Sequence, residues 1–118
     1  MLITDERGTG KESVAELIHL GGPRGQGPFV PTSSAAIPEA LFESEMFGVV
    51  GGALTGAYAS RDGKLKQADG GTLLLDEVEE MPLHIKAKLL RAIERKEVQR
   101  PGDHRTSRLD VRIIAATN

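Results

Sequence analysis

The 118-residue sequence contains no cysteine and no tryptophan, and it has one tyrosine and three phenylalanines. The lack of cysteine excludes disulfides, thiolate metal sites and a cysteine nucleophile, and it is consistent with a reducing cytosol. Because aromatic residues make up only 3% of the chain, we expect an aliphatic hydrophobic core. The length fits one domain or part of one, and a hydrophobic content of 39% is enough for a core of useful size.

The sequence also lacks a membrane segment and a net positive charge. No apolar run approaches the ~20 residues that cross a bilayer, and no signal peptide opens the chain. The formal net charge is -2, so no overall positive field attracts nucleic acid. We therefore expect a cytoplasmic protein that makes no contact with a membrane.

Strand and helix patterns alternate along the chain. Continuous apolar runs predict buried strands, and apolar residues three to four positions apart predict helices. The predicted strands lie near residues 1–3, 29–32, 72–76 and 110–116, and the predicted helices at 11–20, 38–47 and 82–96. This alternation predicts an α/β fold with a parallel sheet and right-handed crossovers.

The helical spacing also predicts which residues face the sheet. In the first predicted helix, Val14, Leu17 and Ile18 share one face, so we expect them to pack on the sheet. In the last predicted helix, Ile85, Leu89 and Ile93 lie on one stripe, and we expect Leu89, Leu90 and Ile93 to belong to the core.

The stretch TDERGTGKES, residues 4–13, nearly matches the phosphate-binding pattern G-x-x-x-x-G-K-[ST]. Asp5 stands at the first glycine position, and Glu12 follows Lys11. In such a loop, backbone N–H groups face phosphate oxygens and the lysine reaches the outer phosphates. The alternative is a glycine-rich turn before a surface helix. The candidate nucleotide-binding residues are Asp5, Glu6, Arg7, Gly8, Thr9, Gly10, Lys11 and Glu12.

A second candidate motif is the pair Asp76–Glu77, which ends an apolar strand. Ligands of parallel α/β sheets bind at the carboxyl ends of strands. Asp76 is suited to hold Mg²⁺ directly or through water, and Glu77 to activate an attacking water. A strand that ends in solvated acids is the alternative. The two motifs together, in this order and on strand ends, favour binding or hydrolysis of a nucleotide.

Thr117 and Asn118 follow the last predicted strand, so they too belong at a carboxyl strand end. A polar pair at this place can orient water against a γ-phosphate, although Thr-Asn is also an ordinary strand terminator. His19, His84 and His104 show no ligand spacing, and we expect surface or packing roles for them rather than a metal site.

The chain resembles the central AAA+ ATPase domain of the sigma-54-dependent transcription activators, the bacterial enhancer-binding proteins, along residues 1–118. GALTGA, residues 52–57, differs by one residue from the GAFTGA loop that marks this family, and it is more specific than a phosphate loop. The other matching stretches are GTGKE (8–12), GPFV (27–30), AAIPE (35–39), ESEMFG (43–48), ADGGTLLLDEV (68–78), MPLHIKAKLLRAI (81–93) and DVRIIAATN (110–118).

The resemblance implies a P-loop AAA+ fold, a three-layer αβα arrangement around a parallel sheet. Residues 1–118 would be a partial sigma-54 interaction AAA+ ATPase domain, with four of the family's five strands and without its helical lid. The last strand would then lie between the first and third, and the first would be an exposed edge. We expect the arginine fingers and the second sensor to lie beyond residue 118, and DNA contact to come from a domain outside this chain.

The resemblance also implies a function: ATP hydrolysis, with ATP and Mg²⁺, coupled to remodelling of the sigma-54 RNA polymerase holoenzyme. The family works as a ring, commonly a hexamer. Asp76 and Glu77 match its Walker B pair, and Thr117 and Asn118 match its first sensor. The residues implied to contact sigma-54 are Gly52, Ala53, Leu54, Thr55, Gly56 and Ala57.

Several residues depart from the family pattern. Asp5 replaces a glycine, and a side chain in the left-handed region costs roughly 1–2 kcal/mol, so we expect weakened ATP binding. Ser33 replaces the asparagine that links the γ-phosphate to the catalytic glutamate, a nucleotide switch. Leu54 replaces a phenylalanine, and Glu79 a glycine. These departures leave open a degenerate AAA+ domain that binds partners without hydrolysis, or an inactive fragment.

Overall fold

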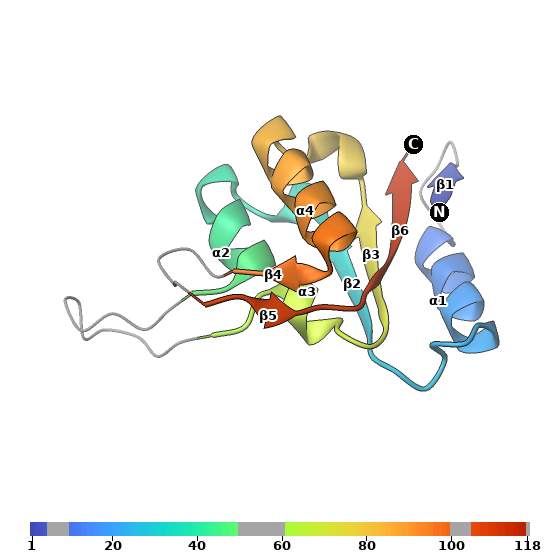
Figure 1. The fold of residues 1–118 in the computed structure, drawn as a ribbon. Coiled ribbons are helices and arrows are strands. Elements are labelled where there is room, and N and C mark those ends of the chain that lie inside the picture. The colour runs from blue at the N-terminus through green and yellow to red at the C-terminus, as the bar shows by residue number, and fades with distance from the viewer. Residues whose placement is uncertain (5–9, 50–60, 100–104, 118) are drawn as a thin grey trace.

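The structure is a computed structural model that describes residues 1–4, 10–49, 61–99 and 105–117. A four-stranded sheet forms the middle layer, with α1 on one face and α2, α3 and α4 on the other (Figure 1). The elements are β1 Leu2–Thr4, α1 Lys11–Gly21, β2 Phe29–Ser33, η1 Ser34–Ala36, η2 Glu39–Leu41, α2 Phe42–Phe47, α3 Lys64–Gln67, β3 Thr72–Asp76, η3 Val78–Glu80, α4 Leu83–Arg95, β4 Glu97–Val98, β5 Ser107–Arg108 and β6 Arg112–Thr117.

The strands of the main sheet run in the order β1-β6-β3-β2, and every pairing is parallel. The predicted parallel sheet is therefore confirmed, as is the place of the last strand between the first and third. Within the described residues, β1 has a strand on one side only, and Met1 and Leu2 are exposed. The short antiparallel pair β4–β5 and the one-turn helix α3 were not predicted from the sequence.

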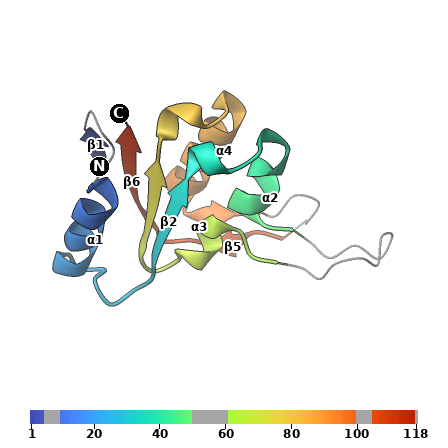
Figure 2. The same cartoon turned by 180° about the vertical axis from the view of Figure 1, so that it is seen from behind.

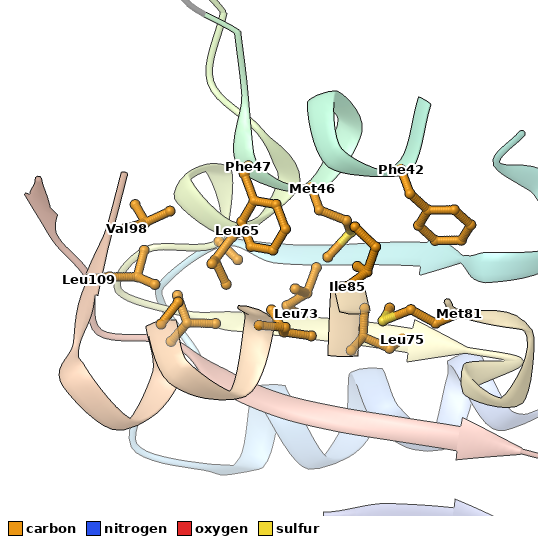
Figure 3. Packing of buried hydrophobic residues seen from close by; sticks show 14 residues of the cluster. Phe42, Met46, Phe47, Leu65, Leu73, Leu75, Met81, Ile85, Val98 and Leu109 are labelled. Carbon is orange, nitrogen blue, oxygen red and sulfur yellow. The ribbon is translucent and has the colours of Figure 1, made fainter. Parts of the chain in front are cut away.

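The larger hydrophobic core lies between the sheet and α2, α3 and α4 (Figure 3). Leu73 and Leu75 point into it from β3, while Leu74 between them belongs to the opposite face, as the alternation of a strand requires. Phe42 and Phe47 are both buried in this core, so the expectation of an aliphatic core was too narrow. The predicted helix at 38–47 begins with the 3-10 turn η2, and only α2 is α-helical.

The smaller core joins α1 to the other face of the sheet, and it corrects the predicted face of this helix. Ala15 is fully buried there, and Ile18 packs against the cluster as predicted. However, Val14 is 45% exposed and Leu17 is 70% exposed. The buried stripe of α1 consists of Lys11, Ala15 and His19, which are four residues apart. The face that packs on the sheet is therefore formed partly by polar residues, and not by Val14 and Leu17 as the apolar pattern predicted.

In α4 the predicted core face is correct except for one residue. Ile85 and Leu89 are buried, and Ile93 is partly buried against the same cluster. Leu90 is 59% exposed because it follows Leu89 by about 100° around the helix. Among the described residues, no helix is long and apolar enough to cross a bilayer.

Candidate functional site

The carboxyl ends of the four parallel strands meet at one edge of the sheet. Their arrowheads point the same way (Figure 2), and the last pairs in register are Ser33 with Asp76 and Thr4 with Thr117. Residues from distant parts of the sequence therefore lie side by side. Ser33 of β2 in particular lies next to Asp76 of β3.

The helix α1 begins at this edge with Gly10 and Lys11. Gly10 has φ +88°, in the left-handed region, and an added Cβ would meet no atom within 4 Å. The backbone angle, rather than crowding, therefore favours glycine here. The carbonyl of Gly10 accepts a hydrogen bond from the N–H of Val14 at 2.9 Å, which starts the helix. Asp5 to Thr9 lie outside the described residues.

The lysine of the candidate phosphate loop is held against the central strand β6. Lys11 is only 1% exposed, and its Nζ donates a hydrogen bond of 2.6 Å to the carbonyl oxygen of Thr117. A buried ammonium needs such a partner, because a charge taken out of water without one is costly. The contact fixes the position of the positive charge between α1 and the end of β6.

The acidic pair leaves β3 through a constrained turn. The N–H of Glu77 donates to Oδ1 of Asp76 at 2.9 Å, which orients the Asp76 carboxylate. Glu77 has φ 54° and ψ 48°, and Lys96 is the other non-glycine residue with a positive φ among those described. The left-handed region costs an ordinary residue roughly 1–2 kcal/mol, and backbone strain of this kind is typical of functional turns.

A further acid, Glu79, contacts the end of β6. The hydroxyl of Thr117 donates a short hydrogen bond to Oε2 of Glu79, which lies in η3. The sequence singled out Glu79 only as a replacement for glycine and assigned it no role. No local pattern predicts the contact, because 38 residues separate the two partners.

An open cleft of about 500 Å³ lies between α1, β2 and the end of β3. Its lining includes predicted residues from both motifs, and the buried Thr32, whose hydroxyl has no hydrogen-bond partner in the described structure. Thr32 and Ser13 were not predicted, although each is the neighbour of a predicted residue. The lining residues are Gly10, Glu12, Ser13, Pro31, Thr32, Ser33, Leu74 and Asp76.

The remaining predicted site residues divide into two groups. Glu77 and Thr117 lie at the same edge of the sheet as the cleft. Asn118 and the loop Gly52–Ala57 lie outside the described residues. Of the three histidines, His19 is buried in packing contacts and His84 is exposed, while His104 lies outside the described part.

The sequence profile of the sigma-54 interaction domain matches residues 1–118. The chain belongs to the sigma-54 interaction domain family. It is 52% identical over its whole length to the anaerobic nitric oxide reductase transcription regulator NorR of Klebsiella pneumoniae (strain 342), and 52% identical to the regulatory protein AtoC of Escherichia coli (strain K12). The chain spans only 23% and 26% of these two proteins.

Crystal structures of NtrX from Brucella abortus have the same fold. One superposes with a TM-score of 0.90 at 38% identity, and covers 99% of this chain and 25% of NtrX. NtrX has also been solved with ADP and with ATP, and these structures give TM-scores of 0.85 and 0.82 over 98% of this chain and 24% of NtrX, at 38% and 37% identity. The predicted P-loop AAA+ fold is thus confirmed.

Proposed function

We propose that this sigma-54 interaction domain binds ATP at the carboxyl edge of its sheet and hydrolyses it to remodel sigma-54 RNA polymerase. The observation that carries the proposal is that Lys11, Asp76, Glu77 and Thr117 lie at one edge of the sheet, where Asp76 also lines the cleft. The four residues come from three separate stretches of the chain. A cation at a helix N-terminus beside strand-end carboxylates is an arrangement suited to a nucleoside triphosphate with its metal. The ADP and ATP complexes of NtrX support the same choice of ligand.

The binding half of the site has three features that suit phosphate. The helix α1 directs its first N–H groups at the edge, and Lys11 holds a positive charge there. Gly10 presents no side chain, so a ligand can approach the backbone. Thr32, whose buried hydroxyl has no hydrogen-bond partner in the described structure, is a further polar residue in the lining of the cleft.

The donor set also fits Mg²⁺. Among the described residues, no group of three or more acids or histidines could cage a metal, whereas Mg²⁺ is usually held by one or two carboxylates together with phosphates and water. Asp76 lines the cleft and would hold the ion. When bound, Mg²⁺ would neutralise charge on the phosphate oxygens.

The hydrolytic half of the site consists of polar residues around Asp76. Glu77 would polarise the attacking water, and its backbone angles are set by the turn after β3. Thr117 and Asn118 would sense the γ-phosphate from the end of β6. Ser33, in register with Asp76, would connect the γ-phosphate to the acidic pair as the nucleotide switch.

The loop Gly52–Ala57 would contact sigma-54 and couple hydrolysis to polymerase remodelling, with subunits assembled in a ring and DNA bound by another domain. The name of the family supports this partner. Thr55 would supply a hydroxyl, and Leu54 an apolar contact. The contact of Leu54 would be weaker than that of an aromatic ring by about 0.5–1.5 kcal/mol, in addition to the effect of its smaller buried area.

The nucleotide part of the proposal is tested by titrating the chain with ATP and with ADP. We expect Lys11→Met, which keeps the length of the side chain and removes its charge, to weaken ATP binding by tenfold or more, because a charge-assisted contact to phosphate is worth about 1.5–3 kcal/mol. Lys88→Met is the matched control, since Lys88 lies over Phe47 on the opposite face of the sheet. Equal losses in the two variants would contradict the site.

The partner part is tested by capture of sigma-54 RNA polymerase on the chain in the presence of an ATP transition-state analogue. We expect Thr55→Ala to reduce capture and Leu54→Phe to increase it, while ATP affinity stays the same. Capture that is unchanged in both variants would reject the loop as the coupling element. ATP binding without phosphate release, measured on the full-length protein, would favour an interaction domain over an ATPase.

A further inference from the structure

Glu79 and the candidate lysine, Lys11, both form hydrogen bonds with Thr117. Thr117 is bound on two sides: its carbonyl oxygen accepts from Lys11 Nζ at 2.6 Å, and its hydroxyl donates to Oε2 of Glu79. One residue at the end of β6 therefore connects the cation of the phosphate loop to an acid in η3. The acid is not part of the Asp76–Glu77 pair.

The backbone places Glu79 on the β6 side of the edge. Glu77 adopts the left-handed conformation, and the chain then turns into η3, which packs against β6. Asp76 lines the cleft together with Ser33 of β2. If Thr117 senses the γ-phosphate as proposed, the carboxylate of Glu79 lies at the same residue.

We propose that Glu79 is a positioning residue that biases this site against a triphosphate relative to a diphosphate. The inference rests on the proposed nucleotide function. Two effects act in the same direction. The Glu79 carboxylate occupies the hydroxyl of Thr117 that would otherwise be available to the γ-phosphate, and its negative charge repels the additional phosphate of ATP. Both effects concern the third phosphate much more than the first two.

The magnitude follows from screened electrostatics. Glu79 is exposed, so its interaction with a phosphate several ångströms away is damped by water and salt. We therefore expect removal of the charge to strengthen ATP binding by about three- to tenfold at low salt, and to change ADP binding by less than about twofold. In Glu79→Gln, which removes the charge and keeps an acceptor for Thr117, the ATP-to-ADP affinity ratio should approach the wild-type value as salt is raised.

The experiment measures ATP and ADP affinities of the 118-residue chain by calorimetric titration, for wild type, Glu79→Gln and Glu79→Ala. The glutamine variant removes the charge and keeps an acceptor for Thr117, whereas alanine removes both. We expect the ATP-to-ADP affinity ratio to rise in both variants, with the larger rise in Glu79→Ala. Thermal unfolding of each variant reports any general loss of stability, which would weaken both nucleotides together.

Glu80→Gln is the matched control. Glu80 is the next residue, is also exposed, and lines a separate cleft with Ser34 and Pro82. Glu80→Gln makes the same change in net charge as Glu79→Gln. An equal rise in the ATP-to-ADP affinity ratio of this control would assign the effect to general electrostatics and overturn the assignment to Glu79. An unchanged ratio in both Glu79 variants, with ATP and ADP both bound, would overturn the inference alone. If neither nucleotide binds to the wild type, the proposed function fails with it.

Discussion

At the amino ends of the strands the buried polar groups bind one another, whereas at the carboxyl ends the buried hydroxyl of Thr32, a residue that lines the cleft, has no partner in the described structure. The amino end is centred on His19, which is 2% exposed and packs beside Phe29. Its Nε2 donates to the carbonyl of Gly27 at 3.0 Å, and in the neutral ring its Nδ1 accepts from the hydroxyl of Thr72 at 2.8 Å. Helix α1 is thus tied to the start of β3.

An ion-pair network lies at the surface of the same end. Arg24 donates to Oδ1 of Asp110 at 2.8 Å, and this hydrogen bond lowers the pKa of that carboxyl and raises the pKa of the guanidinium. The N–H of Asp110 in turn donates to Asp69 at 2.8 Å, which lowers the pKa of Asp69, and Lys66 lies 3.3 Å from the same carboxylate. These contacts join the chain segments that precede β2, β3 and β6.

The carboxyl end has the opposite character. The hydroxyl of Thr32 lacks a partner in the described structure, Glu77 adopts left-handed angles, and the cleft lies beside them. Strain and unsatisfied polar groups persist only where the surrounding fold holds them in place. The comparison teaches that one sheet can hold the protein together at one end and keep a binding site at the other.

The largest expected effect is a loss of stability at the amino end. His19→Ala removes a buried ring and leaves the carbonyl of Gly27 and the hydroxyl of Thr72 unpaired, so we expect the free energy of unfolding to fall by about 2–4 kcal/mol. Chemical denaturation measures this. His84→Ala, at an exposed position, should change stability by less than about 0.5 kcal/mol. A similar small effect of His19→Ala would remove the distinction between the two ends.

The second prediction concerns strain at the carboxyl end. Glu77→Gly should raise the free energy of unfolding by about 0.5–1 kcal/mol, because relief of the left-handed angles exceeds the entropy that glycine loses on folding. Lys96→Gly, at the left-handed end of α4, should give a similar gain. Only the first variant should lose phosphate release when the full-length protein is assayed with ATP. A destabilised Glu77→Gly variant would mean that the turn is not strained.

The smallest expected effect concerns the pH dependence of the surface network. The pKa of Asp69 lies below its ordinary value of 3.8 in the folded protein, so its contribution to stability is present above about pH 4 and is lost as pH falls through the lowered value. We expect Asp69→Asn to cost about 0.5 kcal/mol at pH 7 after solvent screening. The difference from wild type should shrink towards pH 3 in acid titrations of stability. A difference that does not vary with pH would assign the effect to packing instead.

Much of the candidate site was predictable because its motifs are local. The phosphate loop and the acidic pair each occupy a few consecutive residues, and the alternation of strands and helices places both at carboxyl strand ends. The contact between Thr117 and Glu79 and the unpartnered buried hydroxyl of Thr32 were not predictable, because each depends on segments that come together only in the folded sheet.

The sequence by itself determined the order of the elements, the parallel sheet and, through the GALTGA and LLLDEV motifs, the family. Local periodicity and short motifs are sufficient for these. Only the tertiary structure decided which face of α1 is buried, since Ala15 and His19 face the sheet while Leu17 is exposed. It also decided that Lys11 and Glu79 bind the same residue of β6. The physical reason is that burial and hydrogen bonds depend on which distant segments become neighbours, and the local spacing of residues carries no record of that.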